Sequence, residues 1–169
     1  MTAPSVTRVT PTLSWICKDP GRFLMFGMGS GLVRPGPGTW GTLLAWLLWW
    51  AGAKAAPDWA IGLFLALAFG YGCWASHRVG RELGVSDHGG MVWDEMVAFW
   101  LVLWLSPATL TAQAAAFALF RVFDIIKPSP IRELDARFKN GFGVMLDDLL
   151  AAGYALMVMA IGVRLGVIA

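Results

Sequence analysis

Cysteine and charge are both scarce in this 169-residue sequence. Cys17 and Cys73 are the only cysteines, too few for a disulfide framework, and the position of Cys73 in an apolar tract argues against a thiolate metal site. Charged residues make up 14% of the chain, the formal net charge is +2, and no long basic run is present to neutralise a row of phosphates. The composition therefore argues against nucleic acid as a partner and leaves the oligomeric state open.

Apolar residues dominate instead, at 57% of the chain with a mean hydropathy of +0.63. These values predict an integral membrane protein. Together with the apolar tracts and the basic residues described below, they predict an all-α fold with about four to five short transmembrane helices and a polar site at the cytoplasmic face. We expect residues 1–22 to form a surface or disordered arm and residues 23–169 to form a single membrane-embedded domain. The candidate spans are the apolar tracts at residues 40–53, 59–76, 96–105, 108–120 and 144–169.

Proline interrupts the apolar sequence at Pro107. As a single helix, residues 91–123 would reach about 50 Å, well beyond a hydrocarbon core of about 30 Å. Two short spans are therefore favoured over one kinked helix. The first tract, residues 40–53, is also short, so it needs a tilted or locally thinned membrane.

Basic residues indicate the orientation of these spans. They gather before the first tract, directly after the second at Arg78 and Arg81, and between Arg121 and Lys139. With five spans all three regions lie on one side, and the positive-inside rule places that side in the cytoplasm. Only Lys54 and Arg164 remain opposite, which predicts a cytoplasmic N-terminus and an external C-terminus.

Two acidic doublets, Asp94-Glu95 and Asp147-Asp148, stand directly before apolar segments. A carboxylate at the bilayer centre costs about 2.5–3.5 kcal/mol, so such acids are expected to face a watery site at a membrane boundary. Mg²⁺ prefers oxygen ligands and binds through one or two carboxylates together with substrate phosphates. The doublets therefore predict a cation site. Adjacent helical residues point about 100° apart, so one member of each doublet is expected to ligate directly, and the sequence leaves open which.

Glycine and proline fill residues 29–42, and we expect this stretch not to form a regular helix. Its backbone N–H groups suit the close approach of a phosphate, and a helix start follows. The side chains that would assist are the hydroxyls of Ser30, Thr39 and Thr42 and the charge of Arg34. An interfacial turn without a ligand explains the same composition.

Cationic side chains follow at Arg121 and Lys127. Arg121 and Asp124 share a helix face, and basic groups beside acids suggest an anionic substrate. Taken alone, that pair is better explained by an interfacial salt bridge than by a catalytic role. His88 is a candidate for proton transfer or metal ligation, against a structural role as a lone loop histidine.

Four motifs, in order along residues 20–155, resemble those of the phosphatidylglycerophosphatase A family. The resemblance implies a membrane-embedded, Mg²⁺-dependent lipid phosphatase that converts phosphatidylglycerophosphate to phosphatidylglycerol. It also implies a multi-pass protein of a bacterial-type inner (cytoplasmic) membrane. The motifs are residues 29–31 with 37–42, 87–89 with 92–95, 120–132, and 141–148.

Within this resemblance we assign one or two Mg²⁺ ions to Asp94, Glu95, Asp147 and Asp148. Proton transfer is assigned to Asp87 or His88. The nucleophile that attacks the phosphorus is either a water or a carboxylate, Asp94 or Asp148. Substrate binding falls to the polar groups of the glycine-rich stretch with Arg121 and Lys127, supported by Asp124. Two other classes stay open: a small cation or proton carrier, which leaves the basic residues unexplained, and a structural protein.

Overall fold

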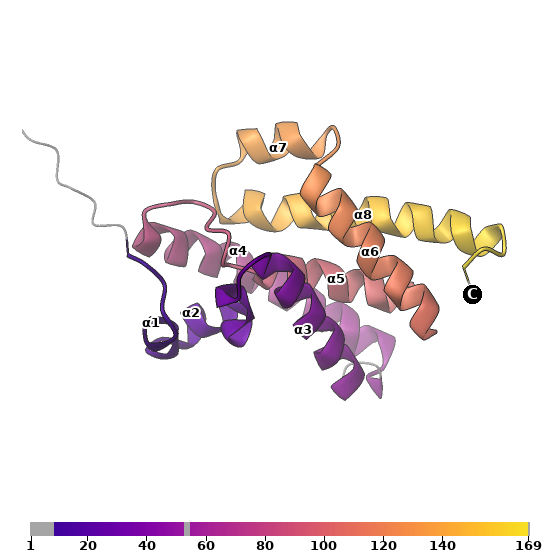
Figure 1. The fold of residues 1–169 in the computed structure, drawn as a ribbon, viewed down its shortest axis with the longest axis horizontal. Helices are drawn as coiled ribbons and strands as arrows, with labels where there is room; N and C mark the ends of the chain where they lie inside the picture. Colours follow the sequence, from indigo (N-terminus) through magenta and orange to yellow (C-terminus); the bar gives the residue numbers. More distant parts are fainter. Residues whose placement is uncertain (1–8, 53–54, 169) are drawn as a thin grey trace, which may run out of the picture.

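The computed structural model describes residues 9–52 and 55–168, and every regular element within them is helical (Figure 1). Lys54, and Arg8 among the basic residues before the first tract, lie outside these residues. The elements are α1 (Leu13–Cys17), α2 (Pro20–Met25), the 3-10 helix η1 (Gly27–Leu32), α3 (Pro37–Ala51), α4 (Asp58–Leu83), α5 (Trp93–Leu105), α6 (Leu110–Ile126), α7 (Ile131–Arg137) and α8 (Gly141–Arg164).

The long helices α3, α4, α5, α6 and α8 coincide with the five predicted apolar tracts. The two-helix interpretation around Pro107 is confirmed, since α5 ends at Leu105 and α6 begins at Leu110. The expectation of irregular structure across residues 29–42 is wrong for residues 37–42, which begin α3. Pro37 opens that helix because its missing N–H has no helical acceptor at this position, and Gly36 before it takes a left-handed conformation (φ 69°).

Within the described residues, two helices are long and apolar enough to cross a membrane: α4, with 26 residues, and α8, with 24. At 1.5 Å per residue they reach about 39 and 36 Å, against a hydrocarbon core of about 30 Å. The 15, 13 and 17 residues of α3, α5 and α6 give only about 20–26 Å. The apolar helices indicate a membrane-associated protein, and the count of four to five spans stays a prediction.

Helix α8 packs against α4, α5 and α6, and its C-terminal turns extend beyond them (Figure 1). Its buried face carries Ala151, Ala152 and Ala155, all fully buried, and such small side chains let neighbouring helices approach closely. Indole groups join the other helices: Trp100 Nε1 donates to Ala45 O at 2.8 Å, and Trp93 Nε1 to Ala68 O at 3.1 Å.

Hydrogen bonds at the end of the bundle where α3 and α5 end show the direction of the helices. We refer to this end as the far end. The last turns of α3 meet the start of α6, where Trp46 and Trp50 both donate to Gln113 Oε1. The end of α5 meets the start of α4 through Trp104 Nε1 and Asp58 Oδ1, 3.0 Å apart. Consecutive long helices therefore run antiparallel, and the starts of α3, α5 and α8 gather at one end with the end of α6.

The described part of the predicted arm, residues 9–22, packs on the bundle. Ile16 of α1 is fully buried in the core. Arg22 pairs with Glu82 at 2.7 Å, and Arg78 pairs with Asp19, so α2 is attached to the last turns of α4 by charge. The Asp19–Arg78 pair also holds the pKa of the Asp19 carboxyl below its usual range.

Candidate active site

Three carboxylates from three helices converge at the end of the bundle where α5 begins. Glu95 of α5, Asp124 of α6 and Asp148 of α8 each bring an oxygen within 4.8 Å of the others. We refer to these residues as the acid cluster. Asp148 is 3% exposed, so this charge is enclosed by protein. Like charges at such spacing repel unless a cation lies among them.

One guanidinium partly neutralises the acid cluster. Arg121 Nη1 lies 3.1 Å from Glu95 Oε1 and 2.8 Å from Asp124 Oδ2, so the salt bridge expected for Arg121 and Asp124 forms. Thr42 Oγ1 accepts from the same Nη1 at 3.4 Å and donates to Gly38 O at 2.8 Å. With three ionised carboxylates and one guanidinium, two negative charges remain uncompensated.

The oxygens of this region suit a hard cation. Glu95 Oε2 and Asp94 Oδ1 are buried without a hydrogen-bond partner among the described residues. A buried carboxylate oxygen without a partner is costly, and Mg²⁺ takes oxygen ligands of this kind. The donor set therefore fits the group that the sequence predicted.

Gly38, in the first turn of α3, lies directly against Glu95. A Cβ atom at this position would stand 1.9 Å from Glu95 Oε1, so no larger residue fits while Glu95 keeps its place. Gly41, one turn later, meets Val92 in the same way, at 2.6 Å from Val92 Cβ. Glycines in this stretch thus allow α3 to pack closely against the start of α5.

The two acidic doublets are each divided by the helix geometry. Glu95 and Asp148 belong to the acid cluster, whereas Asp94 is buried beside it. Asp147 pairs with Lys127, and Lys127 also lies 3.4 Å from Asp135. Each doublet therefore places one carboxylate in the cluster, and its role as a metal ligand stays a prediction.

His88 and Asp87 lie in the loop between α4 and α5. The Gly90 N–H donates to His88 Nδ1 at 3.1 Å, and the imidazole packs on the Phe26 ring, with centroids 5.8 Å apart. Burial, helped by the charge of Arg34, lowers the pKa of His88, so its neutral form with the proton on Nε2 is favoured. The pKa of the Asp87 carboxyl is raised, because the surrounding protein desolvates it although its side chain reaches the surface.

The glycine-rich stretch packs on this loop. A Cβ atom on Gly31 would lie 2.0 Å from Gly90 O, so the two backbones are in direct contact. The Ser30 hydroxyl donates to Gly27 O at 2.8 Å, like that of Thr42 to Gly38 O, so both hydroxyl hydrogens are used within the chain. Arg34 is exposed and Thr39 half-buried.

Sequence reasoning underrated two residues and missed one. Asp124, expected only to support Arg121, lies in the acid cluster itself, and its spacing of three from Arg121 was the available signal. Asp135 links Lys127 to Lys139, at 3.4 Å from each, and only its place in a charged segment hinted at this. Gly38 could not be told from the other glycines of its stretch.

The fold and the site define a small, helical, membrane-associated protein with carboxylates and basic side chains at one end. Residues 23–163 match the family described as Phosphatidylglycerophosphatase A, and the chain belongs to that family. It is 46% identical over 146 residues to the Phosphatidylglycerophosphatase A of Haemophilus influenzae, covering 83% of this chain and 87% of the relative. The Escherichia coli protein of the same name is 37% identical over 134 residues, covering 79% and 77%.

A third relative carries a different name. The putative phosphatidylinositol-3-phosphatase of Bacteroides thetaiotaomicron is 38% identical over 142 residues, covering 80% of this chain and 88% of its own. No solved structure matches the chain. The family makes this protein a phosphoric monoester hydrolase.

Proposed function

We propose that the protein removes the terminal phosphate of phosphatidylglycerophosphate to give phosphatidylglycerol, in a Mg²⁺-dependent reaction. The observation that carries this proposal is the acid cluster, which lies beside Arg121 in a chain of the Phosphatidylglycerophosphatase A family. The names of the relatives differ in headgroup but share a lipid-borne phosphate monoester. The glycerol headgroup is supported by the two relatives named Phosphatidylglycerophosphatase A.

Glu95, Asp124 and Asp148 are the residues that would hold the cation, with the unpartnered Asp94 Oδ1 beside them. When bound, Mg²⁺ polarises phosphoryl oxygens and lowers the pKa of a water ligand. Asp147 is engaged by Lys127, so we propose that it orients this lysine and that its neighbour Asp148 ligates.

Basic side chains in the chain itself suit an anionic substrate. Arg121 leaves its buried Nε without a partner among the described residues, and its guanidinium reaches both Glu95 and Asp124. Lys127 adds a second positive charge next to Asp147. Such fixed cations stabilise the charge on a transferring phosphoryl group, because they need no rearrangement during the reaction.

A proton must reach the leaving lipid oxygen, and the loop between α4 and α5 holds the two candidates. Desolvation raises the pKa of the Asp87 carboxyl, which is the direction that a proton donor requires. His88 has its Nδ1 occupied by the Gly90 N–H and keeps only Nε2 available. We therefore assign the proton transfer to Asp87, positioned by the His88 loop.

We further propose a multi-pass protein of the inner (cytoplasmic) membrane, with four to five spans and the site facing the cytoplasm. The antiparallel order of the long helices supports this, and so does the presence of Arg78, Arg81 and Lys127 at the end that holds the acid cluster. A cysteine at Val167, with Cys17 and Cys73 replaced by serine, should react with an impermeant reagent from outside intact cells. Labelling only after permeabilisation would mean that the proposed orientation or the odd number of spans is wrong.

The test of the reaction is phosphate release by the purified protein in detergent micelles. Phosphatidylglycerophosphate should be hydrolysed faster than phosphatidic acid, phosphatidylinositol 3-phosphate or glycerol 3-phosphate, and EDTA should abolish the activity until Mg²⁺ is restored. A preference for phosphatidylinositol 3-phosphate would change the substrate and keep the phosphatase. Activity that survives EDTA would refute the metal dependence. If the folded protein hydrolysed none of these compounds, the cation-carrier hypothesis would be favoured.

A further inference from the structure

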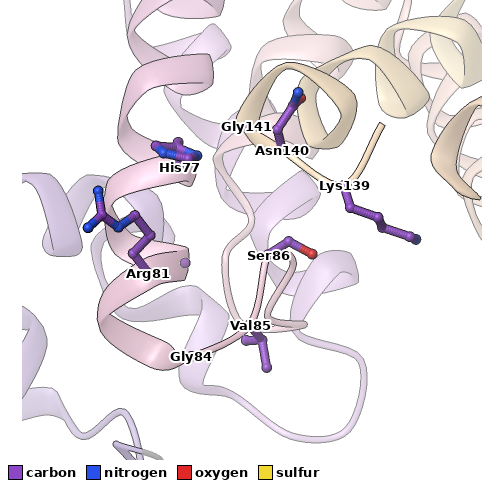
Figure 2. Close-up of a pocket in the computed structure, with 9 residues that line it drawn as sticks. His77, Arg81, Gly84, Val85, Ser86, Lys139, Asn140 and Gly141 are labelled. Atoms are coloured by element: carbon purple, nitrogen blue, oxygen red, sulfur yellow. The ribbon is translucent and has the colours of Figure 1, made fainter. Parts of the chain in front are cut away.

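A cavity of about 310 Å³ lies beside the last turns of α4, apart from the acid cluster. Figure 2 shows His77 and Arg81 on α4, Ser86 on the following loop, and Lys139, Asn140 and Gly141 at the start of α8. None of the three acid-cluster carboxylates lines it. Its volume is at the lower end of the range for small-ligand pockets, about 300–1,000 Å³.

No acidic side chain lines this cavity, and its two charged side chains are both basic. His77 and Arg81 lie on one side of it, on α4, and Lys139 lies on the other side, in the segment before α8, with the charged ends of Arg81 and Lys139 pointing outward (Figure 2). The nearby acids Asp19 and Glu82 already pair with Arg22 and Arg78, and no ion pair of Arg81 is found among the described residues. Arg81 therefore lines the cavity without an ion pair among the described residues, whereas Lys139 has one, with Asp135.

Lys139 is only loosely held. Its ammonium lies 3.4 Å from Asp135, and its side chain is 61% exposed, so the pair is weak and solvent-screened. An anion entering the cavity would therefore meet a lysine that can turn toward it at little cost.

Backbone donors add to this charge. The 24-residue helix α8 starts at Gly141, and the Asn140 side chain accepts from the Gly143 N–H at 3.0 Å. The N–H groups of Gly141 and Phe142 have no acceptor within the helix, and the helix dipole is positive at this end. Gly141 holds the helix start against α4, since a Cβ atom there would lie 1.9 Å from Cys73 O.

The level of the cavity along α4 suggests where its ligand comes from. The apolar tract of α4 runs through residues 59–76 and ends immediately before His77. A tract of that length spans most of a hydrocarbon core of about 30 Å, so His77 and Arg81 would lie among lipid headgroups. The side chains that line the cavity are then within reach of a headgroup phosphate.

We propose that this cavity binds a phosphate group, outside the acid cluster, through Arg81, Lys139 and the start of α8. The phosphate can be carried by the headgroup of an anionic phospholipid or can be free phosphate. The site does not depend on which phosphomonoester the enzyme hydrolyses, because no acid-cluster residue takes part.

The test measures binding by the purified full-length protein in neutral detergent. EDTA is present so that hydrolysis does not contribute to the signal. Native mass spectrometry would count retained dioleoyl phosphatidylglycerol, with dioleoylglycerol as the lipid that lacks phosphate. The variant is Arg81→Gln with Lys139→Gln. The matched control is Lys18→Gln with Arg137→Gln, which removes one lysine and one arginine at exposed positions away from the cavity.

The wild type and the control should retain phosphatidylglycerol alike, and the cavity variant should bind it about tenfold to thirtyfold more weakly, as expected for two basic side chains near a lipid surface. Arg81→Lys with Lys139→Arg should restore binding. Competition by inorganic phosphate at low millimolar concentration would assign the site to the free ion. Equal retention by the cavity variant, or equal retention of dioleoylglycerol, would overturn the proposal.

Circular dichroism and thermal melting would check that the variants fold, and the single change Lys139→Gln, at a mostly exposed side chain, gives a second reading with a smaller loss. Asp148→Asn separates the two hypotheses. It should abolish hydrolysis and leave phosphatidylglycerol retention unchanged, so a failure of either proposal leaves the other intact.

Discussion

The two ends of the helical bundle differ in how their buried amide and carboxylate oxygens are bonded, although Ser106 Oγ at the far end also has no partner among the described residues. At the far end, Gln113 is 1% exposed and its Oε1 accepts from both Trp46 and Trp50, at 2.8 and 2.9 Å. At the site end, Glu95 Oε2 and Asp94 Oδ1 have no partner among the described residues. Closed hydrogen bonding contributes stability, whereas acceptors left open cost stability and are typical of sites that bind a ligand. Substitutions at the two ends should therefore separate activity from stability.

The largest effect is expected in the acid cluster. Asp148→Asn and Glu95→Gln keep the shape of the side chain and remove its charge, so phosphate release should fall by about a hundredfold to a thousandfold or more. Glu133→Gln, at an exposed acid of α7, is the control and should keep full activity. Initial rates in micelles with saturating Mg²⁺ measure this. Equal, mild losses in all three variants would make the cluster a structural feature.

A somewhat smaller loss is expected from Gly38→Ala. The added Cβ would stand 1.9 Å from Glu95 Oε1 and must displace that carboxylate, so activity should drop by about a hundredfold. Gly70→Ala is the matched control, because nothing lies within 4 Å of a Cβ there, and it should slightly stabilise α4. If both alanine variants retained normal rates, the close contact between α3 and α5 would not matter for catalysis.

At the far end, Gln113→Leu should reduce stability and spare the reaction. Trp46 and Trp50 both lose this acceptor, at a cost of about 1–2 kcal/mol for hydrogen bonds in a membrane protein. Thermal unfolding in detergent would measure the loss, and the rate per folded molecule should match that of the wild type. A large fall in this rate, with unchanged melting, would contradict the division between the two ends.

The smallest effect concerns pH at the site end. Burial lowers the folded-state pKa of His88, so its contribution to stability is present above the unfolded pKa of about 6.5 and is lost as pH falls toward the folded value. Protonation of Nδ1 would also break the bond from the Gly90 N–H. Protection of the Gly90 amide against hydrogen exchange, taken relative to the intrinsic rate at each pH, should therefore decrease as the pH falls below the ordinary histidine pKa of about 6.5. His88→Gln should remove this dependence, and an unchanged profile would exclude His88 as its cause.

Much of the fold could be predicted because the signals are local. Uninterrupted apolar sequence located the five long helices, and Pro107 marked the break between α5 and α6. The error at residues 37–42 came from counting glycine and proline without position, since Pro37 is well placed in the first turn of α3. The number of spans is less accessible, because α3 and α5 are shorter than a bilayer.

The candidate site could be predicted from the sequence only in part. The doublets Asp94-Glu95 and Asp147-Asp148 were recognisable because carboxylates beside apolar tracts are costly, and the motifs carried the resemblance to the family. Sequence alone could not separate the members of each doublet. Their separation depends on how α5 and α8 are rotated about their own axes, and packing against neighbouring helices sets that rotation.

The sequence by itself therefore determined the helical class, the membrane-like composition, the polar end of the molecule and the family, because periodicity, hydropathy and motifs are read within a few turns of chain. Tertiary structure alone decided that Asp124 joins Glu95 and Asp148, that Gly38 lies against Glu95, and that Asp147 is taken by Lys127. These contacts join residues that are 20 to 57 positions apart in the sequence. Long-range contacts depend on the packing of whole helices, which no local pattern specifies.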